Sequence, residues 1–359
     1  MMRELLQQAG GLWRGPLRQA GVTPRPPLAA IELSPGSDRP DVTTYLVFGS
    51  GEREPGLVVQ VAERPHAQRR LMNAHAALTE LWAIPALRGA LPRPLGLFDV
   101  ADQCALVMTP LAGTGLDVLL RRGSRARLDQ VEYDLFRAQV WLQLMQEATA
   151  SGAMLFEGRV AVIERLALLH HAGVAVSLPL RAFAEHLAGV AGGFRDLPLP
   201  LTGRHGNFQP ANVLIDNTRL GVIGWSDFAP GVTPLEDVFR FAVGLAQHHP
   251  GPARQPLSAM AAFHHAVLSH NRLSALILEY VDRYLRAVHL PPQAAHLFFG
   301  LFLMDQVLRE RAGGHRPAPN SCLWLPLLVL YAESAEDAIF HRLDGGTTPG
   351  TVVPVPRAA

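Results

Sequence analysis

The residues best spaced for chemistry lie in one stretch, 204–228, which reads RHGNFQPANVLIDNTRLGVIGWSDF. A phosphoryl-transfer loop of this layout needs a carboxylate two residues after the histidine, which accepts the proton of the attacking hydroxyl. An asparagine five residues later and a second carboxylate beyond the hairpin hold Mg²⁺ on the nucleotide phosphates. The asparagine is present as Asn212, but Asn207 and Gly224 stand at the two carboxylate positions.

These two replacements remove the general base and one metal ligand, while the spacing of the loop residues is retained. An amide side chain has no ionisable carboxylate and cannot act as a general base near neutral pH, and glycine offers no ligand atom. The stretch contains two other acids, Asp216 and Asp227. Asp227 follows Gly224 by three residues, so its side chain could swing in to hold a metal ion, or it could cap the next segment or pair with an arginine.

The absence of lysine points the same way. The chain has 32 Lys+Arg residues, and all of them are arginine. Enzymes with this kind of loop use a strand lysine, a compact point charge, to hold the nucleotide phosphates. A GC-rich genome that disfavours lysine codons explains part of the bias, so the missing lysine is secondary support.

The predicted elements place this stretch after a β-rich part of the chain. Residues 43–51 and 52–62 are two β-rich runs around Gly49-Ser50-Gly51, which predicts an antiparallel hairpin, although the same turn could cradle a phosphate. Residues 65–84 have apolar side chains at helical spacing, and residues 94–111 read as two further strands. From Gly115 onward the pattern is helical except around 205–228, with helices expected at 129–149, 158–173, 180–193, 234–249, 256–289, 292–312 and 322–342.

With strands first, helices second and a His-Gly-x-x-x-x-x-Asn turn between them, the chain resembles the aminoglycoside phosphotransferase and choline-kinase-like branch of the protein-kinase fold. PLEDVFRFA at 234–242 also resembles the helix start that this family places after its magnesium loop. The resemblance implies an α+β, two-lobed fold with a small β-rich N-lobe and a larger helical C-lobe. The expected division is an N-terminal extension (1–40), the N-lobe (41–112), the C-lobe (113–342) with its hairpin at 204–228, and a flexible tail (343–359).

The resemblance also assigns roles to single residues. The phosphate-holding lysine of the third strand falls at Gln60, and its glutamate partner falls at or near Ala74, well over a turn from Glu63 and Glu80. The family's catalytic aspartate falls at Asn207, beside the retained His205, and the metal positions fall at Asn212 and Gly224, with Asp227 as a substitute ligand. The remaining nucleotide contacts would be Met108 in the hinge 106–116, and Gly49 and Gly51.

Four losses at the groups that touch phosphate or metal predict a pseudoenzyme that binds a small ligand or a protein partner. The alternative is a divergent, active ATP-dependent kinase of a small-molecule hydroxyl, which would use magnesium held by Asp227 or Asp216 and a phosphate-binding arginine such as Arg204 or Arg53. A third hypothesis is a structural or membrane-peripheral adaptor that makes its contact through the amphipathic residues 1–20. The sequence does not name the ligand or the oligomeric state.

Composition excludes several other classes of protein. The formal net charge is +1 and the arginines are scattered, which argues against a nucleic-acid groove. Cys104 and Cys322 lie far apart without a Cys-x-x-Cys spacing, so no disulfide framework or zinc ribbon is expected, and a reduced bacterial cytoplasm is the default compartment. The apolar runs 294–304 and 322–332 are too short to span a bilayer, so no transmembrane segment is expected.

Overall fold

The computed structural model describes residues 28–33, 41–100, 102–122, 128–217, 219–249, 257–312 and 323–344. The predicted N-terminal amphipathic segment, the tail from 345 onward and Cys322 lie outside these ranges. The chain divides into two compact units. The first unit comprises Met1–Leu119, Val140–Ala150 and Thr202–Val232, and the second comprises Leu120–Gln139, Ser151–Leu201 and Thr233–Ala359. The lobe boundaries inferred from the sequence stay predictions.

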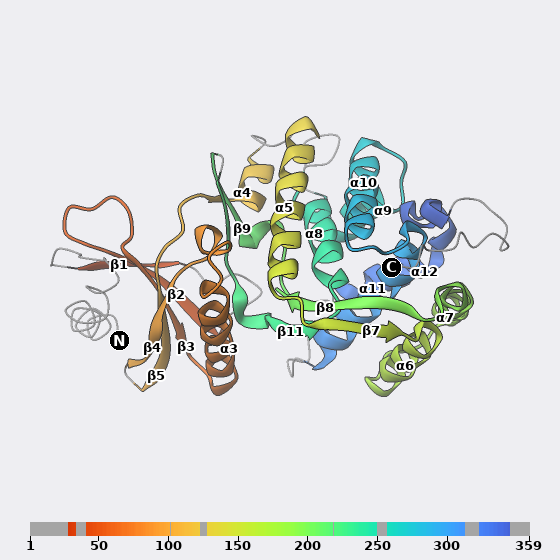
Figure 1. The fold of residues 1–359 in the computed structure, drawn as a ribbon, viewed down its shortest axis with the longest axis horizontal. Coiled ribbons are helices and arrows are strands. Elements are labelled where there is room, and N and C mark those ends of the chain that lie inside the picture. The colour runs from red at the N-terminus through yellow and green to blue at the C-terminus, as the bar shows by residue number, and fades with distance from the viewer. Residues whose placement is uncertain are drawn as a thin grey trace, which may run out of the picture. The chain divides into compact units, whose positions relative to one another are not determined.

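A five-stranded antiparallel sheet forms much of the first unit (Figure 1). Side chains alternate between the two faces of a strand, which gathers Tyr45 and Val47 with Val59 and Val61 in one buried cluster. The predicted hairpin and the two further strands are therefore confirmed. In the sheet order β1-β2-β3-β5-β4, the strands are β1 (Ala29–Leu33), β2 (Val42–Phe48), β3 (Leu57–Ala62), β5 (Gln103–Met108) and β4 (Pro94–Val100).

One helix, α3 (Pro65–Trp82), packs against this sheet. It begins with proline, whose missing N–H would be unpaired at that position in any case. Its buried side chains include Leu71, Ala74 and Leu78, at the three- and four-residue spacing of one helical face. The helix therefore turns Ala74 toward β3 and β5.

A small second sheet in the first unit carries the predicted loop. Its order is β10-β9-β6, with β6 (Thr114–Gly115), β9 (Val213–Asp216) and β10 (Arg219–Val222). β9 and β10 form a hairpin that is flanked by two short 3₁₀ helices, η3 (Pro210–Asn212) and η4 (Trp225–Asp227). The strand–turn–strand unit expected around 205–228 is confirmed. β11 (Ala229–Val232) then pairs with β8 (Leu197–Arg204) at Ala229 and Arg204.

Most of the second unit is helical, and aromatic side chains fill its core. The ring of Phe239 lies 5.3 Å from that of Phe299, and Phe299 lies 4.6 Å from Phe340, measured between centroids. The helices from residue 116 onward are α4 (Leu116–Arg121), α5 (Leu128–Ala148), α6 (Gly158–His171), α7 (Leu178–Ala191), α8 (Leu235–His248), α9 (Ala259–Val267), α10 (Arg272–Ala287), α11 (Ala295–Ala312) and α12 (Trp324–Glu333), with 3₁₀ segments η6 (Ala335–Asp337) and η7 (Ile339–Asp344) after α12.

Three expectations about the helical part are wrong. The single helix expected at 256–289 is two helices, because Asn271 caps the second: its Oδ1 accepts a hydrogen bond from Ser274 N at 3.0 Å, and Ser274 Oγ accepts one from Asn271 N at 2.8 Å. The helix expected at 322–342 ends at Glu333. A strand pair, β7 (Gly152–Phe156) with β8, was not expected, since prolines within a strand disfavour it and β8 contains two.

Among the helices that the structure describes, none has both the length and the apolar character required to cross a bilayer.

Candidate functional site

The loop after β8 is held by His205. This side chain is fully buried. Its Nε2 lies 3.0 Å from the carbonyl oxygen of Ile223, and its Nδ1 accepts a hydrogen bond from the backbone N–H of Asn207 at 3.2 Å. The second bond makes Nδ1 an acceptor, so Nε2 carries the proton and donates to Ile223. The ring also meets that of Trp225 edge-on, at 4.4 Å between centroids. His205 thus positions backbone, and both of its ring nitrogens are engaged.

Gly206 allows this loop to approach η4 closely. Its φ is +78°, and a Cβ at this position would lie 2.3 Å from the backbone oxygen of Asp227. Only glycine fits both the left-handed backbone and the contact. The close approach also brings the Cβ of Asp227 to 3.0 Å from the point where a Gly206 Cβ would stand.

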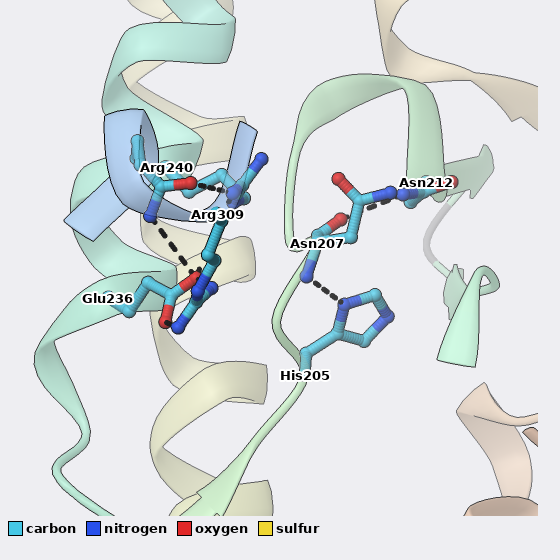
Figure 2. Close-up of polar contacts among 7 residues, drawn as sticks. His205, Asn207, Asn212, Glu236, Arg240 and Arg309 are labelled. Atoms are coloured by element: carbon cyan, nitrogen blue, oxygen red, sulfur yellow. Dashed lines mark hydrogen bonds and ion pairs between the residues drawn. The ribbon is translucent and has the colours of Figure 1, made fainter. Parts of the chain in front are cut away.

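Asn212 uses its amide inside the loop (Figure 2). Its Nδ2 donates a hydrogen bond to the backbone oxygen of Asn207 at 2.7 Å. Gly224 has a φ of +87°, and a Cβ on it would come within 2.8 Å of Cγ and Oδ1 of Asn212. The space that a metal-binding side chain at 224 would cross is therefore filled by the Asn212 carboxamide.

The two acids that could substitute as metal ligands lie at different ends of the hairpin. Asp227 is next to Gly206, whereas Asp216 ends β9 and accepts a hydrogen bond from Asn217 Nδ2 at 3.3 Å. Asp216 lies four residues beyond Asn212, roughly 13 Å along extended chain. Within the described part of the chain, no three His, Cys, Asp or Glu side chains come together in a way that could hold a metal ion. The structure thus brings only Asp227 to the loop.

The positions predicted for the lysine and glutamate pair meet at one small cavity. Gln60 on β3 and Ala74 on α3 both line it, and its volume is about 20 Å³. The other lining residues are Val42, Arg70, Leu71, Trp225 and Ser226. The expected strand–helix juxtaposition is therefore present without either charge. The functional roles of Gln60 and Ala74 stay predictions.

Sequence reasoning missed Arg70 at this cavity. Arg70 precedes Ala74 by one helical turn and therefore shares its face of α3, a signal that was available from the spacing. The two arginines named from the sequence lie elsewhere, Arg53 in the β2–β3 turn and Arg204 at the end of β8. Neither of them lines this cavity.

Gly49 and Gly51 belong to the turn of the β2–β3 hairpin. The oxygen of Gly49 accepts a hydrogen bond from Glu52 N at 3.1 Å, and Gly51 has a φ of +75°. Thr44, which pairs with Gln60, precedes Gly49 by five residues, so the turn lies roughly 16 Å along the strand from Gln60. The structure does not bring these glycines to the cavity, which favours a plain turn over a phosphate cradle.

Met108, the predicted hinge contact, is buried at the end of β5. It lies opposite Val58 of β3 in the ladder, two residues from Gln60. Its contact with a nucleotide stays a prediction.

Asn73 ties α3 to the loop region of the first unit. Its Nδ2 donates to the backbone oxygen of Ser226 at 2.6 Å and to that of Phe228 at 3.2 Å. Trp225, the first residue of η4, is buried and donates from Nε1 to Val222 O at 3.0 Å. The helix that carries Arg70 is therefore fixed to η4.

The start of α8, which was recognised in the sequence, has structural roles in the second unit. Glu236 accepts hydrogen bonds from Arg309 of α11, while Arg240 donates to Gln306 (Figure 2). Asp237 is fully buried. Burial, and secondly the charge of Asp237, raise the pKa of Tyr280.

A sequence model described as the phosphotransferase enzyme family, APH, matches residues 35–276, more than half of the chain. The chain belongs to this family. Two crystal structures of a thermostable mutant of aminoglycoside phosphotransferase APH(4)-Ia share the fold of this family member. The apo form is 16% identical with a TM-score of 0.51, covering 89% of this chain and 96% of that one. A ternary complex of a variant with ADP and hygromycin B is 15% identical, with a TM-score of 0.51 and coverage of 89% and 95%.

A choline/ethanolamine kinase family protein from Mesorhizobium loti is also similar, at 14% identity and a TM-score of 0.49, over 96% of this chain and 100% of that chain. A search of curated proteins gave no match. The expected kinase-like α+β fold, with a small antiparallel sheet and a helical remainder, is confirmed.

In this member of the phosphotransferase enzyme family, the groups near the loop are mainly neutral. Asn207, Asn212 and Gln60 offer amides, and Ser226 offers a hydroxyl. Amides and hydroxyls can donate and accept hydrogen bonds, but they take no proton near neutral pH and are weak ligands for Mg²⁺. The arrangement suits binding better than proton transfer.

Proposed function

We propose that the protein has lost phosphoryl transfer and acts by binding, either of a small molecule or of a protein partner. The observation that carries the proposal is the contact between Asn212 and Gly224. The amide of Asn212 fills the space that a carboxylate at 224 would use, and bonds to the backbone of Asn207. At position 224 the metal-binding carboxylate is absent, and in addition the Asn212 carboxamide packs into the space that it would need.

The expected loss of rate is large. A positioned general base contributes about 10²–10⁴ to an enzymatic rate, and removal of one preorganised electrostatic donor costs about 10²–10³. Asn207 stands at the position of the base, and Gln60 stands at that of the phosphate-holding lysine. Because phosphoryl transfer depends almost entirely on positioning and electrostatics, turnover should fall to the background rate.

The family supplies the frame for a ligand without supplying its identity. One related structure is a ternary complex of that protein with ADP and hygromycin B. For this chain we propose a cytoplasmic bacterial protein that uses the family's fold to bind its ligand. We propose no nucleic-acid partner, because the net charge is +1 and the arginines are scattered.

Two measurements on the purified full chain test the proposal. Thermal unfolding with ATP, in Mg²⁺ and in EDTA, should show no stabilisation that depends on Mg²⁺. ADP release over a long incubation should stay at the level of a protein-free blank. Magnesium-dependent stabilisation together with ADP release would overturn the proposal.

One observation favours a second candidate, a divergent active kinase that needs ATP and Mg²⁺. Asp227 lies beside the loop, since its Cβ is 3.0 Å from the Gly206 Cβ position. If Asp227 held the metal, Asp227→Asn would abolish ADP release. The matched change Asp216→Asn, at the far end of the hairpin, would leave it unchanged. The pattern separates catalysis through Asp227 from contamination by another ATPase, which neither variant would affect.

A further inference from the structure

The small cavity lined by Gln60 and Ala74 also contains polar groups that have no evident structural role. Ser226 lines it, is 9% exposed, and has a buried Oγ without a hydrogen-bond partner. A buried hydroxyl left unpaired costs about 1–3 kcal/mol, so a group that accepts its hydrogen bond would stabilise the site. The need for a partner is the first sign of a ligand here.

Arg70 supplies a positive charge at the same cavity. Its side chain lines the cavity while the residue remains exposed, and it forms no hydrogen bond or ion pair within the described part of the chain. Gln60 adds an amide whose Nε2 makes a long hydrogen bond, 3.5 Å to Thr44 Oγ1. A guanidinium, a hydroxyl and an amide can therefore all donate to one ligand.

Among the residues that the structure describes, no acid lines this cavity, and its lining consists of Val42, Gln60, Arg70, Leu71, Ala74, Trp225 and Ser226. A guanidinium with neutral donors favours an anion, and without a carboxylate the same groups are only weak ligands for a metal ion. We propose that Arg70, Ser226 and Gln60 form a metal-independent site for an oxyanion, that is, a phosphoryl or carboxylate group of the ligand. The proposal rests on the proposed binding function, because a catalytic site would need the metal.

The size of the cavity limits how the anion is held. About 20 Å³ accommodates one or two water-sized groups. One oxygen of the anion therefore enters to meet Ser226 Oγ. The rest of the group lies at the mouth, where the exposed guanidinium of Arg70 can form the charge-assisted bonds that dominate the affinity.

The fixed position of α3 supports a preformed site. Asn73 bonds to the carbonyls of Ser226 and Phe228, so the helix that carries Arg70 and the segment that carries Ser226 are held together. A ligand then needs to order only the Arg70 side chain, which reduces the entropic cost of binding.

Isothermal titration of the full chain with pyrophosphate, with ATP and with malonate, each in EDTA, tests the site. Saturable binding of at least one of these anions is expected, and the anion that binds identifies phosphoryl or carboxylate chemistry. Arg70→Ala should weaken that binding about 10- to 100-fold, the loss for a charged hydrogen bond. Arg70→Lys should recover part of it, because it keeps the charge but loses the two-pronged geometry.

Two further variants make the result specific. Ser226→Ala should weaken binding about fivefold, since one neutral hydrogen bond is lost. Arg69→Ala removes the same charge from the neighbouring position of α3, which does not line the cavity, and should leave the dissociation constant within about twofold. If Arg69→Ala and Arg70→Ala weakened binding equally, the loss would come from the overall positive charge of α3 and not from a specific contact, and the site would be refuted.

The proposal is also overturned if none of the three anions binds in EDTA, or if Arg70→Ala binds as tightly as the native protein. These outcomes are distinct from failure of the proposed function, which is read from ADP release. A protein that releases ADP with Mg²⁺ yet binds pyrophosphate in EDTA through Arg70 would refute the first proposal and keep the second.

Discussion

The carboxamide of Asn212 occupies the space that a side chain on Gly224 would need. A Cβ on Gly224 would lie 2.8 Å from both Cγ and Oδ1 of Asn212. Gly224→Asp must therefore displace Asn212 and break its bond to Asn207 O, which costs about 1 kcal/mol, with backbone strain at a φ of +87° added to this. We expect a loss of about 1–3 kcal/mol in urea unfolding. Gly224→Ala is the control: it makes the same contact without a carboxylate, and a loss confined to the aspartate would mean that charge and not space is responsible.

Restoring both carboxylates should fail to restore phosphoryl transfer. Asn207→Asp combined with Gly224→Asp supplies a base and a metal ligand, but Gln60 and Ala74 still leave the phosphates without the family's charged pair. ADP release by the double variant is expected to equal the blank. Adding Gln60→Lys and Ala74→Glu to the double variant tests whether the fold supports phosphoryl transfer once all four charged groups are restored. Turnover by the double variant alone would show that the charged pair at 60 and 74 is not required.

Gly206 should be far less tolerant of a side chain than Gly51. Both have positive φ, +78° and +75°, but a Cβ on Gly206 meets Asp227 O at 2.3 Å whereas nothing lies within 4 Å of one on Gly51. Gly51→Ala is expected to cost about 1 kcal/mol, the backbone term alone. Gly206→Ala should cost about 3 kcal/mol or more in chemical unfolding, because backbone must move. Equal losses would show that the loop can shift away from η4 freely.

The layout of the loop could be predicted from the sequence because it depends on local spacing. His205, Asn207 and Asn212 lie within eight residues, and their backbone and side-chain bonds link positions two and five residues apart. The strand–helix meeting of Gln60 with Ala74 was predicted from the family resemblance, which assigns these positions to one charged pair. The periodicity of each element fixes only the face on which each residue lies.

The rest depends on which segments meet in space. Ser226 comes to Arg70 only because α3 packs on η4, and no pattern in either segment states that they pack. The contact between Asn212 and Gly224 requires the hairpin turn to close at one register. The β7–β8 pairing was missed for another reason: tertiary context overrides the unfavourable prolines, Pro198 and Pro200.

Acid should destabilise the second unit through His296. Burial first, and then the charges of His186 and His341, lower the pKa of His296 from 6.5 to about 3. Between pH 6.5 and 3, His296 is therefore protonated in the unfolded chain and neutral in the folded chain. Its contribution to the free energy of unfolding is fully present above pH 6.5 and is lost as the pH drops. The loss should reach about 2 kcal/mol at pH 5. The pKa of His186 is lowered by burial and by His341, which acts in the same direction.

Urea unfolding from pH 8 to pH 4.5 measures this slope. His296→Gln cannot titrate and keeps a side chain that can bond to Tyr331 Oη, the partner of His296 Nδ1 at 2.8 Å, so its stability should vary less with pH. His270→Gln, at an exposed position, should keep the native slope. A native slope in His296→Gln would assign the acid sensitivity to groups other than His296, such as His186.

Asn73 should control both the stability of the first unit and the oxyanion site. Asn73→Asp keeps the shape of the side chain but replaces its donor by an acceptor, which then faces the carbonyls of Ser226 and Phe228 at the 2.6 and 3.2 Å contacts. A loss of about 1–2 kcal/mol is expected. Pyrophosphate binding in EDTA should weaken as well, although Asn73 does not line the cavity, because α3 is no longer held against η4. Gln68→Glu makes the same amide-to-acid change on an exposed part of α3 and should leave both quantities unchanged. If Gln68→Glu weakened binding as much as Asn73→Asp, added negative charge on α3 would explain the effect, and the link between the helix and η4 would not.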